Sequence, residues 1–175
     1  MSPETEIRES QPGDRAAIES LYPAVFPDED LLPLLRALLQ EPAGVLSLVA
    51  TVDAAIAGHV LFTNCGIAGT TEALALLGPL AVATARQRQG VGSALVRTGL
   101  QRLEDAGVAQ VCVLGDPGYY GRFGFAPEEA VAPPCPLPGE WRAAWQSITL
   151  SHAEPSRPGT LTVPPPWQQP ALWGP

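Results

Sequence analysis

Residues 74–95 read LALLGPLAVATARQRQGVGSAL, and this stretch decides the fold. Its first part, Leu74 to Val82, is almost wholly apolar, which predicts a buried strand. Gly78 and Pro79 interrupt that strand, and because proline cannot donate a ladder hydrogen bond, we expect the strand to bulge or splay there. Its second part opens a segment, 90–106, in which apolar residues recur at helical spacing, so an amphipathic helix is predicted after the strand.

The turn between the predicted strand and helix, QRQGVGS over 87–93, has the composition of an anion-binding loop. Gly90 and Gly92 let backbone N–H groups approach a ligand closely, and a helix N-terminus adds unpaired donors and a partial positive charge. The turn lacks the GK[ST] of a P-loop and the third glycine of a dinucleotide fingerprint. Taken alone, the pattern leaves two interpretations open: a cradle for a pyrophosphate, or glycines that only end a strand and begin a helix.

The charges along the chain single out the same region. The chain has 18 acidic and 10 basic residues, for a net charge of −8, which disfavours general binding to nucleic acids. Between Glu72 and Glu104 there is no acidic residue, and that window holds four arginines: Arg86, Arg88, Arg97 and Arg102. All ten basic residues are arginine, which excludes a Schiff-base lysine and a P-loop lysine.

The length and composition suit one globular domain, because the chain has 175 residues, of which 46% are hydrophobic and 16% charged. We expect that domain over 1–163 and a proline-rich C-terminal tail over 164–175, and the sequence leaves open whether the tail packs on the body. No basic leader precedes an apolar stretch, and no purely apolar run approaches about 18 residues. We therefore expect a cytoplasmic protein that has neither a membrane nor a nucleic acid as a partner.

The three cysteines, Cys65, Cys112 and Cys135, have neither metal-site spacing nor a histidine cluster, so we expect reduced thiols. Cys112 lies in an apolar run, which favours a buried inert thiol over an acyl carrier.

Further elements are predicted on both sides of the deciding stretch. Strands are expected over 6–9, 45–52, 55–63, 110–114, 145–150 and 159–163, and helices over 12–25 and 31–40. The runs 45–52 and 55–63 are joined through Asp53, and such close spacing indicates an antiparallel hairpin. The segment 115–125, GDPGYYGRFGF, indicates a turn and a short helix rich in aromatic residues.

Three of these segments, LGPLAV, QRQGVGSAL and GDPGYYGRFGF, together resemble the GNAT superfamily of acyl-CoA-dependent N-acetyltransferases, and within it the YhbS-type subgroup. The resemblance implies a GNAT-like α+β fold. Its central sheet would be mixed and mostly antiparallel, with about six or seven strands and a splay between the fourth and fifth. About four helices would cover both faces of that sheet.

The same resemblance implies acetyl-CoA as co-substrate. Backbone groups of Leu80, Ala81 and Val82 would pair with the pantetheine arm like an added strand. The pyrophosphate would be held by the six residues of the glycine turn: Arg88, Gln89, Gly90, Val91, Gly92 and Ser93. Arg86 or Arg97 could meet the 3′-phosphate, although exposed arginines are often only solvated.

The reaction that the resemblance implies is direct attack by a neutral amine on the acetyl thioester, which requires no metal. Tyr120 occupies the position of the family's general acid, and a phenol with a pKa of about 10 suits protonation of a thiolate. The backbone N–H of Val82 would polarise the thioester carbonyl. The base stays open among Glu72, Asp116, His59 and a water chain, because Asp116 also suits a helix cap and His59 a core position.

Other functions stay open at this point. The chain could be a non-catalytic CoA-binding or protein-interaction module, or an enzyme that uses another nucleotide in the same cradle. Turnover with a panel of amines, and competition among CoA, ATP and NAD, would separate these options. The sequence does not specify the acceptor amine of a small molecule or peptide, the acyl-chain preference, or the oligomeric state, for which a homodimer is one option.

Overall fold

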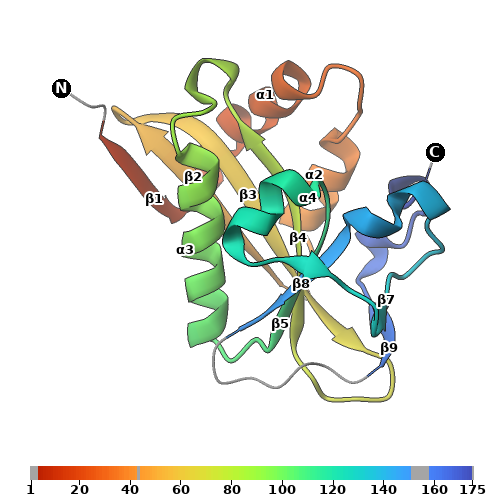
Figure 1. Cartoon of the computed structure of the whole chain (residues 1–175). Helices are drawn as coiled ribbons and strands as arrows, with labels where there is room; N and C mark the ends of the chain where they lie inside the picture. The colour runs from red at the N-terminus through yellow and green to blue at the C-terminus, as the bar shows by residue number, and fades with distance from the viewer. Residues whose placement is uncertain (1–3, 43, 151–157, 175) are drawn as a thin grey trace. The chain divides into compact units, whose positions relative to one another are not determined.

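The computed structural model describes residues 4–42, 44–150 and 158–174 (Figure 1). These residues form four α-helices, nine strands and several short 3-10 helices. The chain divides into two compact units, each of which is described by itself. Unit 1 comprises the chain up to Phe62 together with Pro79–Gly99, and unit 2 comprises Thr63–Gly78 and the chain from Leu100 onward. Within the described residues, no helix is long and apolar enough to cross a membrane.

Unit 1 contains a sheet in the order β1-β2-β3, formed by β1 (Thr5–Glu9), β2 (Val45–Val52) and the first part of β3 (Ala55–Ile67). Strands β1 and β2 are antiparallel, with Ile7 opposite Ala50. The connection between β2 and β3 is two residues long, and both residues have positive φ, 50° at Asp53 and 70° at Ala54. Such a pair forms the type I′ turn that matches the twist of two antiparallel strands, so the predicted hairpin is confirmed.

Helices α1 (Arg15–Val25), α2 (Leu32–Leu39) and the first part of α3 (Val91–Asp105) belong to the same unit, close to the predicted bounds. Consecutive residues of β3 show that helices cover both faces of the sheet, because neighbouring side chains of a strand point in opposite directions. A Cβ atom on Gly58 would lie 3.0 Å from Cδ1 of Leu95 in α3. On the other face, His59 contacts Tyr22 of α1.

Small residues allow α3 to approach β3 closely. A Cβ atom on Gly99 would lie only 2.1 Å from Cε2 of Phe62, whose side chain is fully buried. The absence of a side chain at Gly99 therefore lets the phenyl ring occupy the helix surface. This contact fixes the depth at which α3, and with it the glycine turn, lies on the sheet.

Unit 2 contains the parallel pair of strands that makes the sheet a mixed one. The first part of β4 (Leu74–Val82) runs parallel to β5 (Gln110–Leu114), from Leu74 opposite Gln110 to Leu77 opposite Val113. Strand β5 is antiparallel to β8 (Trp145–Thr149), which also pairs with β6 (Ala126–Pro127). Strand β9 (Gly159–Thr162) pairs with the end of β3 and, in parallel, with β7 (Val131–Ala132).

The mixed sheet and the α+β class are confirmed, but the number of strands is nine rather than six or seven. The additional strands are β6 and β7, which have two residues each. A pair of residues is too short to show an alternating pattern of apolar and polar side chains, so neither strand is detectable in the sequence. The remaining helical elements are α4 (Pro117–Tyr120) and the 3-10 helices Pro12–Asp14, Thr84–Arg86, Gly121–Phe123, Gly139–Ala144, Pro165–Trp167 and Pro170–Leu172.

The C-terminal segment packs within unit 2, which answers the question that the sequence left open. Trp173 is only 1% exposed, and its Nε1 donates to the backbone oxygen of Trp167 at 2.9 Å. Trp167 in turn donates to the hydroxyl oxygen of Thr63 at 3.0 Å, and its ring lies 3.7 Å from the position of a Cβ atom on Gly78. The division into a domain over 1–163 and a tail over 164–175 stays a prediction.

Candidate active site

Strand β4 changes its pairing at Gly78. The parallel ladder with β5 ends at the pair Leu77–Val113, and Gly78 follows with a φ of +139°, a conformation that favours glycine. Pro79 comes next and has no N–H to donate. The expected departure of the strand at Gly78 and Pro79 is thus present, and beyond it β4 continues to Val82.

In unit 1, the end of β4 leaves one backbone edge available. The N–H of Ala83 donates to the oxygen of Ala57 in β3 at 2.7 Å. Because backbone groups point alternately to the two edges of a strand, Ala81 also faces β3, whereas Leu80 and Val82 face the opposite edge. Of the three residues predicted to pair with pantetheine, the geometry therefore favours Leu80 and Val82, and it turns Ala81 toward the sheet.

The glycine turn leads directly into the N-terminus of α3. Arg88 has a φ of 64° and Gly90 a φ of 84°. A left-handed conformation is uncommon for a residue other than glycine, and such residues gather at functional sites. The N–H of Ala94 donates to the oxygen of Gly90 at 3.0 Å as the helix begins, so the N–H groups of the first turn, at 91–93, have no acceptor within the helix.

Two glutamine side chains hold this turn in place. Nε2 of Gln87 donates to the oxygen of Val82 at 3.1 Å, and Nε2 of Gln89 donates to the oxygen of Ala85 at 3.2 Å. The first of these bonds ties the turn to the end of β4. The predicted cofactor residues of the strand (80–82) and of the turn (88–93) thus belong to the same unit, and a side-chain bond links the two segments.

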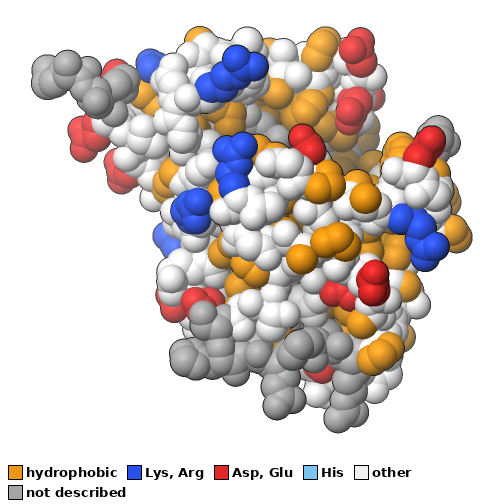
Figure 2. Space-filling model, viewed as in Figure 1, with side chains coloured by type: hydrophobic (Ala, Val, Ile, Leu, Met, Phe, Trp, Pro, Cys, Tyr) orange, Lys and Arg blue, Asp and Glu red, His pale blue; other side chains and the backbone are white. Residues whose placement is uncertain are grey.

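The charge around the turn suits an anion. Arg88 is exposed, and Arg86 in the preceding 3-10 helix is half-buried. Figure 2 shows arginine side chains gathered along α3 and above it in the view, whereas acidic side chains lie mainly elsewhere on this face. The free N–H groups and the positive end of the helix add to the positive electrostatic potential of these arginines.

Tyr120 lies in unit 2, at the end of α4. The helix is started by Asp116, whose carboxylate accepts a hydrogen bond from the N–H of Gly118 at 2.9 Å. The Tyr120 ring packs at right angles to Tyr119, with centroids 5.0 Å apart, and edge-on to Phe125 at 5.7 Å. Among the described residues its hydroxyl has no hydrogen-bond partner, so it is free to donate to a ligand.

Burial raises the pKa of the Tyr120 phenol above its ordinary value, and the neighbouring Tyr119 adds to this effect. The phenol therefore holds its proton at neutral pH, as a general acid must before the leaving group forms. Tyr119 is stacked under the guanidinium of Arg122, 4.5 Å from the ring centroid. These contacts give Tyr119 a packing role.

Two of the three side chains considered as a base are occupied by structural contacts. His59 is fully buried, and its two ring nitrogens lie 2.7 Å from the Tyr22 hydroxyl and 2.9 Å from the Ser47 hydroxyl. Burial lowers the pKa of His59 to about 3. Asp116 caps α4 as described. Both residues thus have the structural roles that the sequence offered as alternatives.

Glu72, the third candidate, precedes β4 in unit 2. One oxygen of its carboxylate, Oε2, is buried and has no hydrogen-bond partner among the described residues. Nine residues of β4 separate it in the chain from the loop after Val82. Glu72 is thus separated in the sequence from Val82, which belongs to unit 1.

Cys65, which is half-buried, and Cys112, which is buried, are poorly suited to act as nucleophiles. Burial raises the pKa of Cys65 to about 12 and raises the pKa of Cys112 as well, so neither is a thiolate at neutral pH. All three cysteines are free. Within the described ranges, no three metal-ligating side chains come together.

Unit 1 also has an acidic hollow that sequence analysis missed. It has a volume of about 360 Å³ and lies between α1 and α2, and its lining includes Tyr22, Phe26 and the consecutive acidic residues Asp28, Glu29 and Asp30. The Tyr22 hydroxyl lies 3.5 Å from the oxygen of Pro79, which precedes Leu80 in β4. The run of three acidic residues directly after Pro27 was the signal that could have revealed this hollow.

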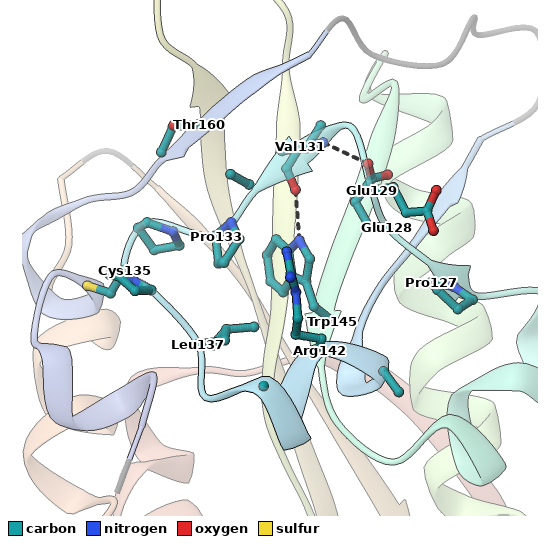
Figure 3. A pocket seen from close by; sticks show the side chains of 15 residues that line it. Pro127, Glu128, Glu129, Val131, Pro133, Cys135, Leu137, Arg142, Trp145 and Thr160 are labelled. Atoms are coloured by element: carbon teal, nitrogen blue, oxygen red, sulfur yellow. Dashed lines mark hydrogen bonds between the residues drawn. The ribbon is translucent and has the colours of Figure 1, made fainter.

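A larger groove of about 1110 Å³ lies wholly in unit 2 (Figure 3). Its proline-rich wall faces Trp145, whose Nε1 donates to the oxygen of Val131 at 2.8 Å. Glu128 fixes the neighbouring loop, since its carboxylate accepts from the N–H groups of Ala130 and Val131 and from the side chains of Gln110 and Ser147. These bonds make the pKa of Glu128 lower than usual, although burial opposes them.

Comparison with known proteins agrees with this geometry. Residues 15–125 match the Acetyltransferase (GNAT) family. The chain is 35% identical to the uncharacterized N-acetyltransferase YjhQ of Escherichia coli (strain K12) over 147 residues, 74% of this chain and 81% of that protein. It is also 35% identical to the uncharacterized N-acetyltransferase YhbS of the same strain over 120 residues, 68% of this chain and 72% of that protein.

Two solved structures are similar over nearly the whole chain. The structure of Escherichia coli YhbS in complex with CoA has a TM-score of 0.86 at 28% identity, and the match covers 97% of this chain and 94% of the YhbS chain. A GNAT family acetyltransferase from Brucella melitensis, in complex with acetyl-CoA, has a TM-score of 0.75 at 31% identity and covers 93% of this chain and 97% of its own.

Proposed function

The chain belongs to the GNAT family of acetyltransferases, and from this premise we propose that it transfers the acetyl group of acetyl-CoA to an amine by direct attack on the thioester. In this reaction the amine nitrogen bonds to the carbonyl carbon and the carbon–sulfur bond breaks. The amine loses one proton and the thiolate gains one. The protein must therefore hold two substrates, stabilise the developing oxyanion and move two protons.

The observation that carries the proposal is the backbone of β4 and α3 in unit 1. Leu80 and Val82 turn their N–H and C=O groups away from β3, where an extended pantetheine arm could pair with them. The N–H groups of Val91, Gly92 and Ser93, with the exposed Arg88, suit the pyrophosphate. Bound in this way, acetyl-CoA supplies an activated acetyl group, and the Val82 N–H would polarise its carbonyl.

We assign the general acid to Tyr120. Its raised pKa keeps the phenol protonated at neutral pH, and its hydroxyl has no competing partner among the described residues. The proton of this hydroxyl would pass to the departing sulfur. Since His59 and Asp116 are occupied by structural contacts, and Glu72 belongs to a different unit from Val82, water is the acceptor that we propose for the proton of the amine.

The acceptor that best suits unit 1 is an amine that binds as its cation, gives one proton to water to become the neutral nucleophile, and loses a second proton after the attack. Asp28, Glu29 and Asp30 line the hollow between α1 and α2 together with two aromatic rings, and amines are attracted both to carboxylates and to ring faces. The net charge of −8 acts in the same direction over longer distances. The location in the cytoplasm and the homodimer stay predictions, and membership of an enzyme family disfavours the non-catalytic module.

The first test is the change in melting temperature with acetyl-CoA. We expect a rise for the unchanged protein and little or no rise for Arg88→Glu and Gly92→Glu, which place negative charge in the cradle. Gly13→Glu adds the same charge at an exposed position where a Cβ atom would meet nothing within 4 Å, so it should keep the rise. Since Gly92 is buried, the result for Gly92→Glu is used only if that variant melts cooperatively without acetyl-CoA.

The second test is release of CoA thiol with a panel of amines. Turnover that Tyr120→Phe lowers to a small residual rate, with the melting rise preserved, would support the enzyme and its acid together. A melting rise without turnover on any amine would favour the CoA-binding module, and the absence of a rise at millimolar acetyl-CoA would contradict the proposal as a whole.

A further inference from the structure

The ring of Tyr120 rests against a position that has no side chain. Gly115 follows β5 directly, and a Cβ atom built on it would lie 2.4 Å from Cε2, 3.0 Å from Cδ2 and 3.5 Å from Cζ of Tyr120. The nearest of these distances is far inside van der Waals contact. A side chain at residue 115 would therefore overlap with the Tyr120 ring. The overlap would fall on the part of the ring next to the carbon that bears the hydroxyl.

The backbone of Gly115 is held from both sides and cannot yield to the ring. Its N–H donates to the oxygen of Ala144 at 3.0 Å. Its oxygen accepts a hydrogen bond from Nε2 of Gln146 at 3.1 Å, and Gln146 in β8 is 1% exposed. A buried amide that is fixed in a strand makes this end of β5 rigid, so an added methyl group would displace the ring and not the strand.

Two aromatic neighbours pack against other parts of the ring. Phe125, which is 5% exposed, meets the Tyr120 ring at an angle of 72°, and Tyr119 meets it at 87°. The ring thus lies in a slot between the Gly115 backbone and these two rings. In such a slot the position of the phenol hydroxyl depends on the width that Gly115 leaves open.

We propose that Gly115 is a positioning residue for acetyl transfer: by lacking a side chain it places the hydroxyl of Tyr120 where the leaving sulfur is protonated. This inference rests on the proposed function, in which Tyr120 is the general acid. It extends that function to a residue with no polar side chain of its own.

The test compares Gly115→Ala with Gly121→Ala. Gly115 does not have a positive φ, so alanine fits its backbone and the substitution reports on the ring contact. Gly121 belongs to the same motif and has a helical φ of −56°, and a Cβ atom there would meet nothing within 4 Å. We expect Gly115→Ala to lower kcat about 100-fold, the effect of a misplacement near 1 Å, with the KM for acetyl-CoA within about twofold. Gly121→Ala should stay within about twofold in both constants.

A double variant separates this inference from the role of Tyr120. In the Tyr120→Phe background the acid is already absent, so adding Gly115→Ala should cost less than about threefold. If Tyr120→Phe turns over at the normal rate, the assignment of the acid is wrong. If Tyr120→Phe is inactive while Gly115→Ala keeps the normal kcat, the positioning inference is overturned.

A third variant keeps the test decisive if Gly115→Ala folds poorly. Phe125→Leu, combined with Gly115→Ala, reopens the slot from its other side and should restore both cooperative melting and a large part of kcat. Restored folding without any recovery of kcat, together with a normal melting rise on acetyl-CoA, would contradict the inference.

Discussion

The hydroxyl of Tyr22 lies 2.7 Å from Nδ1 of His59, and this contact joins α1 to β3 inside unit 1. The chain of polar groups continues through Ser47, 2.9 Å from Nε2 of His59, to Ser10, whose hydroxyl donates to that of Ser47 at 2.6 Å. Both nitrogens of the imidazole are thus satisfied in its neutral form. A second proton on the ring would disrupt this arrangement in a place that water does not reach.

His59 should therefore make the fold sensitive to acid. Its pKa is about 3 in the folded protein and 6.5 as the ordinary value, so between these limits the unfolded chain binds one more proton than the folded chain. The stabilisation is fully present above pH 6.5 and is lost progressively as the pH falls toward 3. We expect the free energy of unfolding, measured by urea titration, to fall more steeply between pH 7 and 4.5 in the unchanged protein than in His59→Gln.

The comparison with His59→Gln removes the contributions of other groups, because carboxylates such as Glu128 titrate in both proteins. Equal slopes in the two proteins over this range would contradict the assignment of the acid sensitivity to His59.

Gly99 and Phe62 should be energetically coupled. A methyl group on Gly99 would enter the space of the Phe62 ring, 2.1 Å from Cε2, so Gly99→Ala should lower the free energy of unfolding by about 1–3 kcal/mol. Phe62→Leu makes room for that methyl group, and the double variant should be more stable than the sum of the two single changes predicts. Urea unfolding of the unchanged protein, the two single variants and the double variant measures the coupling. If the two changes in the free energy of unfolding simply add, the helix moves to accommodate the methyl group and the two residues are not coupled.

Arg88 should contribute to binding and not to folding. Its φ of 64° is costly for a residue with a side chain, by about 1–2 kcal/mol. Arg88→Gly relieves that strain and removes the cation, so we expect a melting temperature that does not fall and a KM for acetyl-CoA that rises severalfold. Arg142→Gly, at another exposed arginine, should leave this KM unchanged, and an unchanged KM in both variants would remove Arg88 from the cradle.

The acidic hollow should determine the affinity for the acceptor. Replacing Asp28, Glu29 and Asp30 with Asn, Gln and Asn should raise the KM for a cationic amine about 10-fold at low salt, with a smaller effect at high salt. The KM for acetyl-CoA should not change. The matched control neutralises three exposed acidic residues outside the hollow, Glu6, Glu129 and Glu140, so equal effects of the two triple variants would indicate steering by net charge alone.

The sequence predicted those parts of the fold whose signals are local. The apolar run 74–82, the glycine turn and the helix after it appear at their predicted places, because strand and helix periodicity depend on residues that are close in the chain. The departure at Gly78 and Pro79 was also predictable, since it follows from the backbone chemistry of these two residues.

Features that depend on distant partners were not predictable. The fixed loop at Glu128 requires Gln110 and Ser147, which are 18 and 19 residues away. The direction of the Ala81 backbone depends on a bond between Ala83 and Ala57. Likewise, the importance of Gly115 appears only when the ring of Tyr120 is in place. In each case the deciding contact is tertiary, and no periodic pattern along the chain indicates it.

The indole rings of unit 2 give the protein an optical property of its own. Trp173 lies 5.7 Å from Trp145 and 5.9 Å from Trp167, measured between ring centroids, at angles of 73° and 56°. The electronic transitions of indole rings that lie this close together, at such angles, couple to one another. This coupling splits their ultraviolet circular dichroism band into a couplet, a pair of bands of opposite sign. A Cβ atom on Gly78 would lie 3.7 Å from the Trp167 ring, so the couplet reports on the place where the ladder between β4 and β5 ends, without any label attached to the chain.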